Sequence, residues 1–451
     1  YVSRVLGAEN IGLFSYTYAV ANYFVLFANL GIKNYGSRTI AMVRNNKEEL
    51  NRNFSEILSI HIIFSIIVIF VYLVLLFFFV EDNLVIFLIQ SIYVFAAVFD
   101  INWFFFGIEK FKLTVGRNTL VKILSVFLVL VFVKTQTDLW IYALILALSV
   151  FVGQSVVWFA LKQYVSWRRP SWANMKQHIR PLFVLFLPIL ALSLYKYMDK
   201  IMLGSISSNV QVGFYENAEK IINVPMSLIM AFGVVLMPRI ANMVTSKDKG
   251  EVFKLIDMSM EAVMLLAIAI SFGLAGISFV LAPIFFGYEF EECGILIMGL
   301  AVTVPFMAFA NVIRTQYLIP YKEDKIFVVS LFLGAAVNLI VNIILIPYMA
   351  ARGAVIGTIF AEIIVCIYQS YFVRKKIFIK KYLLNTIPPI LIGIVMFVFV
   401  FQIGNVMNIN IVTLILQLLV GMFIYAVGVF LLMLKSRTRL MVLLRKFVVR
   451  Y

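Results

Sequence analysis

The chain has 451 residues, of which 63% are hydrophobic and only 13% are charged. Soluble globular proteins carry about 25% charged residues, so this composition excludes a soluble enzyme and leaves room for about a dozen membrane crossings of about 20 residues each. The formal net charge of +16 indicates basic cytoplasmic loops and contact with anionic lipids, and argues against a nucleic-acid partner.

Apolar runs between charged breaks predict an all-α polytopic membrane protein with thirteen visible spans. In chain order the spans cover residues 13–33, 54–80, 84–106, 118–133, 139–161, 182–204, 213–237, 255–285, 293–313, 326–348, 353–373, 383–404 and 411–434.

Basic residues gather in every second loop. The positive-inside rule therefore places the C-terminus in the cytoplasm, together with loops 34–53, 107–117, 162–181, 238–254, 314–325 and 374–382. In the tail, 435–451, basic residues alternate with leucines and a phenylalanine. This pattern predicts an amphipathic helix that lies on the anionic inner leaflet.

Three pairs of similar segments lie about 200 residues apart: 1–7 and 197–204, 12–16 and 213–217, and 106–110 and 319–323. This repeat and the outside position of the N-terminus predict a further helix ahead of Tyr1, which makes fourteen in total. Six helices separate the two halves, so the repeat is parallel, with its axis along the membrane normal. Such duplication is typical of secondary transporters, whose substrate site lies between the repeats.

The spans predict five regions along the chain. They are an N-terminal lobe (1–161), a cytoplasmic linker (162–181), a C-terminal lobe (182–374), an extra helix pair (382–434) and the basic tail (435–451).

Four stretches carry a family resemblance: YVSRVLGAENIGLFSY at 1–16, MDKIMLG at 198–204, GFYENAEK at 213–220, and a run from Asn338 and Asn342 through Pro347, Gly353 and Ala354 to Glu362. They resemble the polysaccharide-biosynthesis flippases of O-antigen and teichoic type, within the multidrug/oligosaccharidyl-lipid/polysaccharide exporter (MOP) superfamily, which also contains the multidrug antiporters and the lipid II flippase.

The resemblance implies a V-shaped, MATE-like pair of six-helix lobes around a central cavity. It also implies that an undecaprenyl-pyrophosphate-linked oligosaccharide moves by alternating access from the inner to the outer leaflet of a bacterial or archaeal cytoplasmic membrane. The extra pair 382–434 departs from a twelve-helix pattern. The lipid II flippase also carries two extra helices, which are thought to form a groove for the lipid tail.

Ionisable groups at bilayer depth cost about 2.5–3.5 kcal/mol each on insertion scales, so they normally face a cavity or a partner. Lys196 and Lys200 lie one helical turn apart, with Asp199 beside them. The two ammonium groups are candidates for binding the pyrophosphate, with Arg4 at the mouth of the cavity. The alternative is that they pair with acidic residues of the next helix, Glu216 or Glu219.

Further candidates lie on neighbouring helices. Glu216 and Lys220 are spaced i,i+4, which fits either a local ion pair or substrate contact. Asn22 and Tyr23 belong to a polar and aromatic helix that suits a sugar in a wet cavity. Interfacial tyrosine belts are the competing interpretation, above all for Tyr16 and Tyr18.

One carboxylate lies in mid-span. Glu362 is a candidate for binding a coupling H⁺ or Na⁺, together with Asn338 and Asn342 on the preceding helix. The alternative is a neutral glutamic acid hydrogen-bonded to that helix. Asp100, in contrast, lies near a cytoplasmic boundary, where snorkelling explains it.

The remaining residues predict no enzyme, no cofactor and no metal site. Cys293 and Cys366 lie in different apolar segments, and His61 and His178 are isolated in the sequence. A cation-coupled multidrug antiporter is the first alternative function. A polysaccharide polymerase or glycosyltransferase is the second, although the outer loops are short and no D-x-D motif occurs. We expect a monomer whose partners are lipids and the lipid-linked glycan, with polymerase and glycosyltransferases of the same pathway as possible further partners.

Overall fold

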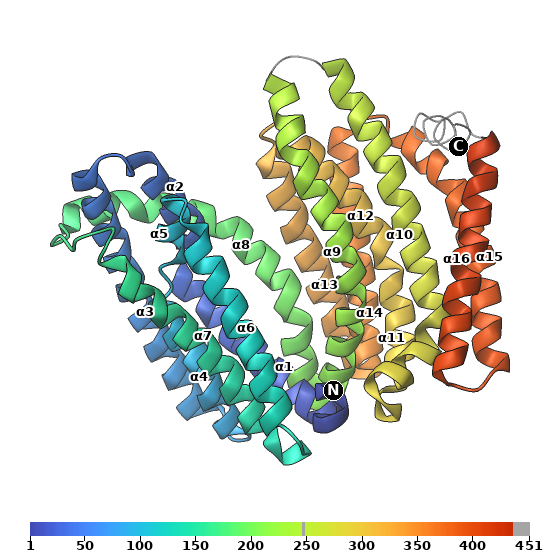
Figure 1. Ribbon diagram of the computed structural model, residues 1–451, viewed down its shortest axis with the longest axis horizontal. Coiled ribbons are helices and arrows are strands. Elements are labelled where there is room, and N and C mark those ends of the chain that lie inside the picture. The colour runs from blue at the N-terminus through green and yellow to red at the C-terminus, as the bar shows by residue number, and fades with distance from the viewer. Residues whose placement is uncertain (246–248, 436–451) are drawn as a thin grey trace. The chain divides into compact units, whose positions relative to one another are not determined.

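A computed structural model describes residues 1–245 and 249–435 (Figure 1). Within these ranges the protein is helical and contains no strand. The chain divides into two compact units, Tyr1–Gly204 and Ser205–Tyr451. The predicted tail helix, 435–451, lies outside the described residues apart from the backbone of Lys435.

Unit 1 contains eight α-helices and a short 3₁₀ turn before α7. They are α1 (Val2–Asn29), α2 (Ile32–Val43), α3 (Lys47–Phe79), α4 (Leu84–Val98), α5 (Asn102–Gly107), α6 (Phe111–Phe132), α7 (Leu139–Leu161) and α8 (Trp172–Ile206). Gly7 has φ 77° and ψ 173°, so it separates a short first helical segment from the rest of α1.

Unit 2 contains the other helices among the described residues. They are α9 (Asn209–Thr245), α10 (Lys249–Phe286), the 3₁₀ helix η2 (Tyr288–Phe290), α11 (Cys293–Ala301), α12 (Thr303–Ile313), the π-helix η3 (Arg314–Leu318), α13 (Asp324–Met349), α14 (Ala351–Val373), α15 (Ile379–Val406) and α16 (Ile411–Lys435).

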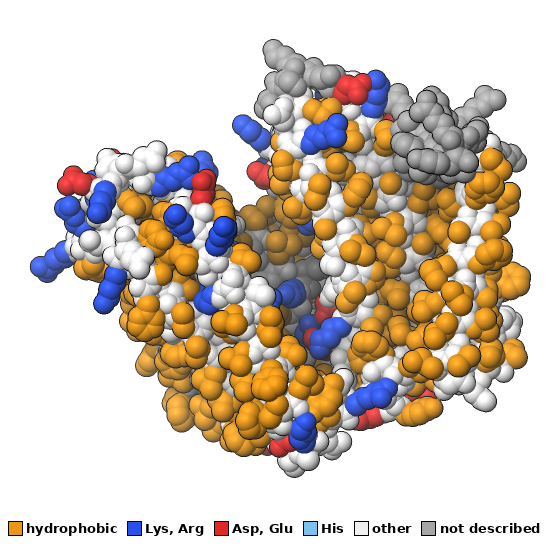
Figure 2. All heavy atoms as spheres, viewed as in Figure 1, with side chains coloured by type: hydrophobic (Ala, Val, Ile, Leu, Met, Phe, Trp, Pro, Cys, Tyr) orange, Lys and Arg blue, Asp and Glu red, His pale blue; other side chains and the backbone are white. Residues whose placement is uncertain are grey.

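Thirteen segments of the described chain are long and apolar enough to cross a membrane, which confirms the predicted number of spans. α16 has the exposure expected of a helix that faces lipid. Only 11% of the residues in its most apolar stretch are buried inside the protein. Hydrophobic side chains cover the visible face of α15 and α16 (Figure 2). Large apolar side chains exposed over whole helices are what lipid-facing surfaces require.

Two predicted boundaries differ from the structure. Residues 172–181 belong to α8 and not to a linker, because the basic residues and Pro181 there lie on the first turns of one long helix. α8 also packs with unit 1, where we expected a lobe ending at residue 161 and a second lobe starting at 182. The fit is tight: a Cβ on Gly31 would lie 2.9 Å from the carbonyl oxygen of Leu182.

The predicted repeat extends to backbone detail. Glu109 and Lys322 both adopt left-handed φ values, 60° and 61°. The next residue in each turn, Lys110 or Glu323, donates its N–H to a carbonyl five residues back, at 2.9 Å and 2.8 Å. The same turn therefore follows the third span of unit 1 and its counterpart in unit 2.

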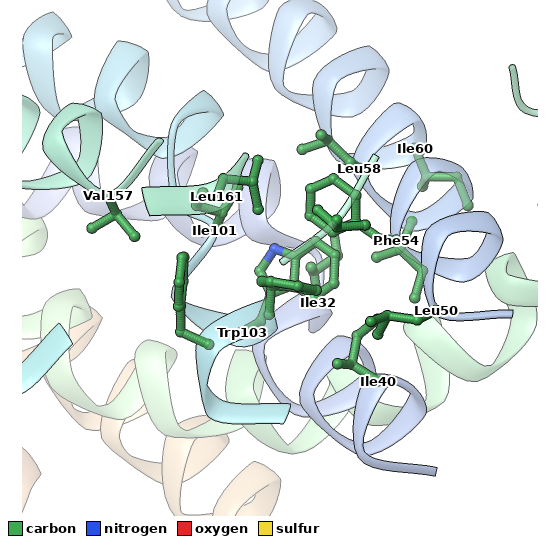
Figure 3. Close-up of a cluster of buried hydrophobic side chains, with 14 of the residues drawn as sticks. Ile32, Ile40, Leu50, Phe54, Leu58, Ile60, Ile101, Trp103, Val157 and Leu161 are labelled. Carbon is green, nitrogen blue, oxygen red and sulfur yellow. The ribbon is translucent and has the colours of Figure 1, made fainter. Parts of the chain in front are cut away.

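A cluster of aromatic and aliphatic side chains forms the core at one end of unit 1, where α2, α3, α5 and α8 meet (Figure 3). Phe54 stacks on Trp103 with ring centroids 5.6 Å apart, and both side chains are buried. Gly36 of α2 packs directly on the indole, because a Cβ there would lie 2.5 Å from Trp103 Cε3.

Gly36→Ala is therefore expected to destabilise the protein by about 1–3 kcal/mol, the usual range for overpacking a core. The measurement is the thermal unfolding midpoint of the purified protein in detergent. Gly116→Ala in α6 is the matched control, since nothing lies within 4 Å of a Cβ there. That variant should be at least as stable as the wild type, because alanine favours a helix over glycine. Equal midpoints for the two variants would contradict the packing argument.

Candidate functional site

In unit 1, the predicted substrate residues of α1 and α8 come together. Tyr23 of α1 lies edge-on to Tyr197 of α8, with ring centroids 5.9 Å apart, and its hydroxyl donates to the Ser193 carbonyl at 3.4 Å. The ammonium group of Lys196 lies 5.2 Å from the centre of the Tyr197 ring. Asp199 is close enough to Tyr23 for its carboxylate to interact electrostatically with the tyrosine hydroxyl. We call Tyr23, Lys196, Tyr197 and Asp199 the α1–α8 cluster.

The two predicted phosphate-binding lysines differ in their surroundings. Lys196 is exposed, whereas Lys200, one turn further along α8, is 8% exposed and its neighbour Asp199 is 5% exposed. Lys196 can therefore meet a large anionic ligand directly. Lys200 instead adds positive charge from within a packed region, where electrostatic interactions are screened less than in water.

The other unit 1 candidates are placed differently. Asn22 donates its side-chain amide to the Tyr18 carbonyl of its own helix at 2.8 Å. Arg4 is exposed, but on the short segment ahead of the Gly7 break. Tyr16 packs closely on Gly204, because a Cβ there would lie 2.3 Å from its ring. Tyr16 is thus a packing residue of α1 and α8.

In unit 2, Glu216 and Lys220 of α9 form the local ion pair, with an N–O distance of 3.1 Å. The Lys220 side chain remains 53% exposed, so it is still accessible to a ligand. Beside the pair, the Tyr215 hydroxyl is 2.9 Å from the Thr358 hydroxyl, which joins α9 to α14.

Glu362 lies one turn beyond Thr358 on α14 and is 6% exposed. Glu362 interacts electrostatically with Arg314. The sequence predicts that Arg314 lies in a cytoplasmic loop. The structure corrects that assignment, since Arg314 begins the π-helix η3 inside the ninth span. Its guanidinium donates to Asn311 Oδ1 at 2.6 Å. Single-turn π segments in membrane helices frequently mark functional sites.

Asn338 and Asn342 lie in the seam between α13 and α14. Asn342 donates to Asn338 Oδ1 at 3.2 Å, and both side chains are buried. A Cβ on Gly357 of α14 would lie 2.1 Å from Asn342 Oδ1, so only glycine allows this approach. The two amides therefore pack against the helix that carries Glu362.

Removing Arg314 alone should destabilise unit 2, because its guanidinium donates to Asn311 Oδ1 at 2.6 Å and interacts electrostatically with Glu362. Loss of a hydrogen bond to a charged group costs about 1.5–3 kcal/mol. We expect Arg314→Met to lower the unfolding midpoint in detergent and Glu362→Gln to restore part of it in the double variant. Arg352→Met is the control, since Arg352 and Glu292 form an exposed pair at 3.3 Å, which is worth at most about 1 kcal/mol. Additive effects of the two inner substitutions would contradict the coupling.

Sequence reasoning missed the role of Asp100. The third span breaks between α4 and α5, and Asp100 Oδ1 closes the break by accepting from the backbone and side-chain nitrogens of Asn102, at 3.0 Å and 2.6 Å. Asn102 also donates to Gln154, at 2.8 Å, and accepts from Arg117, at 3.0 Å. Asp100 is therefore part of a polar network and does not simply snorkel.

An apolar groove of about 490 Å³ lies within unit 2, between α10, α15 and α16. Gly273 of α10, Met396 of α15 and Met422 of α16 line it, with Pro225 of α9 at one side. Gln417 is the main polar group, and its amide donates to the Val400 carbonyl at 2.9 Å. The groove is shaped for a hydrocarbon ligand, because its lining is almost wholly apolar.

Comparison with solved structures shows the fold. The chain superposes on the lipid II flippase MurJ in an inward closed conformation with a TM-score of 0.73, at 16% identity over 95% of this chain and 94% of that one. It also superposes on an inward-facing MATE-family multidrug resistance transporter of the MOP superfamily, with a TM-score of 0.65 and 14% identity over 83% and 92%.

Sequence comparison gives the family. A Shigella dysenteriae protein described as a "Putative O-antigen transporter" is 24% identical over 384 residues, which are 82% of this chain and 93% of that protein. The lipid II flippase MurJ of Bacillus subtilis is 28% identical over 46% of this chain and 41% of its own length. The family model for polysaccharide biosynthesis proteins matches residues 1–244. The chain is thus a multi-pass protein of the cytoplasmic membrane, and it belongs to the polysaccharide biosynthesis protein family.

Proposed function

We propose that this protein is a flippase that moves an undecaprenyl-pyrophosphate-linked oligosaccharide from the inner to the outer leaflet by alternating access. The observation that carries the proposal is the α1–α8 cluster, in which an exposed lysine and two tyrosines lie together. A compact ammonium group suits phosphate oxygens, and tyrosine rings suit the apolar faces of sugars. The relatives named as O-antigen transporter and lipid II flippase support a substrate of this class.

Each part of the substrate has a counterpart in the chain. Lys196 would contact the pyrophosphate, with Lys200 and Asp199 setting the local charge, while Tyr23 and Asn22 would contact the sugars. In unit 2, Lys220 and Glu216 offer a second charged surface that sugar hydroxyls or phosphates would meet. Arg4 is exposed and would meet the headgroup at the outer end of α1.

The polyprenyl tail would lie in the groove between α10 and α16. Lipid tails are as apolar as the groove, so no hydrophobic force drives the tail out of the bilayer. The groove would act through shape, by holding a long unsaturated chain while the headgroup crosses.

The coupling ion, H⁺ or Na⁺, would bind at Glu362, with Asn338 and Asn342 holding the adjacent helix. Glu362 and Arg314 interact electrostatically, so an arriving cation would compete with the guanidinium. If so, Glu362→Gln should remove the dependence of flipping on the ion gradient while leaving substrate binding intact. If Glu362→Gln depends on the ion gradient as strongly as the wild type does, Glu362 does not bind the coupling ion.

The multidrug antiporter alternative shares this fold and makes a different prediction for binding. Two lysines in the substrate region would repel cationic drugs. Native mass spectrometry of the purified protein should therefore detect the undecaprenyl-pyrophosphate-linked oligosaccharide and not a lipophilic cation such as ethidium. Lys196→Ala should weaken binding of the glycolipid by about tenfold, the effect of one lost charge-assisted contact. Preferential binding of the cation would favour the antiporter.

A further inference from the structure

Three helices of unit 1 meet at a buried hydrogen-bonded chain that the substrate mechanism does not use. The Tyr35 hydroxyl of α2 lies 2.6 Å from His178 Nδ1 of α8. The other ring nitrogen, Nε2, lies 2.9 Å from Glu56 Oε2 of α3. The Glu56 and His178 side chains are only 1% and 3% exposed. We call Tyr35, Glu56 and His178 the buried triad.

The surroundings of the triad are apolar. Met175 and Leu182 of α8 and Ile57 of α3 belong to the core cluster drawn in Figure 3, against which Tyr35 also packs. Ionisable groups in such an environment are costly, and a buried ion pair can often be replaced by apolar residues without loss of stability. In transporters, buried chains of acid and histidine instead mark proton relays.

The other charged groups near the triad lie at the surface. On α2, Lys33 and Arg38 are exposed, as are Lys176 and Arg180 on α8. On α3, Glu48, Glu49 and Arg52 are exposed, and the buried His61 lies beyond Glu56. The exposed Arg168 donates its backbone N–H to Ser55 Oγ at 2.9 Å, and the Thr39 hydroxyl lies beside Tyr35. Among the described residues, the buried part of the triad is thus one carboxylate and one imidazole bonded to each other, with Tyr35 bonded to the ring.

The donor and acceptor count allows the triad to take up one proton without moving a heavy atom. With one ring proton, Nε2–H donates to the Glu56 carboxylate and Nδ1 accepts from the Tyr35 hydroxyl, so the net charge is −1. A second ring proton at Nδ1 donates to the Tyr35 oxygen instead, and the Tyr35 O–H turns away from the ring, where the neighbouring Thr39 hydroxyl can accept it. The net charge becomes zero, so the buried net charge is removed.

We propose that the buried triad is a proton-binding site whose occupancy controls transport. This deepens, and rests on, the proposed flippase function. The link to the substrate region is α8, which carries His178 near its cytoplasmic end and Lys196 about 27 Å further along. Proton uptake turns a hydrogen bond between ring and carboxylate into an ion pair. It therefore changes how firmly α8 is held to α2 and α3.

The test starts with proton binding, which needs no transport. The chain has two histidines, so ¹⁵N-histidine labelling of the full-length protein in nanodiscs gives two ring systems. The His178 signals are those absent from His178→Gln. We expect them to change from a singly to a doubly protonated ring as the pH is lowered, and we expect Glu56→Gln to lack this change. Signals of His178 that do not titrate in the wild type would overturn the proposal.

The second arm measures flipping of a lipid-linked glycan in proteoliposomes as a function of pH. The wild-type rate should change by up to about tenfold per pH unit, the limit for one proton, with the midpoint seen by NMR. In the Glu362→Gln background, which lacks the proposed coupling site, His178→Gln should abolish this dependence, while Lys176→Gln, an exposed neighbour on α8, should keep it. An unchanged pH dependence in a folded His178→Gln protein of that background would also overturn the proposal. If the wild type flips no glycan, the proposed function fails, and NMR still decides whether the triad binds a proton.

Discussion

Replacing Lys196 and Lys200 together with alanine is expected to lower flipping of the lipid-linked oligosaccharide by roughly 100-fold or more. Lys196 would contact the pyrophosphate directly, and the loss of its hydrogen bond to a charged group costs about 1.5–3 kcal/mol. Loss of the buried Lys200 charge adds to this cost, because electrostatic interactions are screened less inside the protein than in water. The measurement is the initial rate of flipping in proteoliposomes at equal protein content. The expected loss should be concentrated in substrates with the pyrophosphate and be smaller for a monophosphate analogue.

Two controls separate substrate binding from folding. Lys200 is buried next to Asp199, so the double variant is compared with Lys196→Ala alone, which changes an exposed side chain. Lys196→Arg keeps the charge and should retain most of the activity. Lys33→Ala, an exposed lysine on α2, should have no effect. Wild-type flipping by a folded double variant would remove the assigned role of both lysines.

Filling the apolar groove is expected to slow flipping of substrates with long tails by about tenfold. Gly273 lines the groove, and a Cβ there would meet only Met396 Cε, at 3.8 Å. Gly273→Phe therefore adds a ring to the groove with little strain on the helix. Misplacement of a bound substrate by about 1 Å can cost about 100-fold in an enzyme, so a tenfold effect is a moderate expectation. The readout is the ratio of flipping rates for undecaprenyl-linked and short-chain prenyl-linked forms of the same glycan.

The short-chain substrate tests whether the groove holds the tail. Its rate should be nearly the same in Gly273→Phe and in the wild type, because it does not reach far into the groove. Gly116→Phe adds the same ring to a position of α6 with open space around it and should leave both rates unchanged. If Gly273→Phe slows both substrates equally, the groove does not select the tail.

The spans could be predicted because membrane insertion depends on properties of neighbouring residues. These are the length of each apolar segment and the number of basic residues in the loops beside it. The same holds for the Glu216–Lys220 pair, whose partners are one turn apart on one helix. Helix ends were less predictable. Charged residues at 176–180 suggest a loop, whereas they lie on the first turns of α8.

The missed interactions join residues that are far apart in the sequence. His178 looked isolated, yet its partners Tyr35 and Glu56 are 143 and 122 residues away. The sequence predicts a loop at Arg314, whereas Arg314 begins the π-helix η3 and interacts electrostatically with Glu362. Gly31 lies between α1 and α2 with φ 72°, whereas Gly233, at the equivalent place about 200 residues later, lies inside α9. Packing between helices decides such differences, and a single sequence does not record it.

The most direct test of the proposed function is flipping by the purified wild-type protein alone. Proteoliposomes would contain a fluorescent undecaprenyl-pyrophosphate-linked oligosaccharide, and a membrane-impermeant glycosidase outside would measure how much glycan becomes accessible. We predict a rate above that of protein-free vesicles, with loss of this rate in Lys196→Ala/Lys200→Ala. Equal accessibility with and without the folded wild-type protein, under an imposed proton or sodium gradient of either direction, would contradict the account.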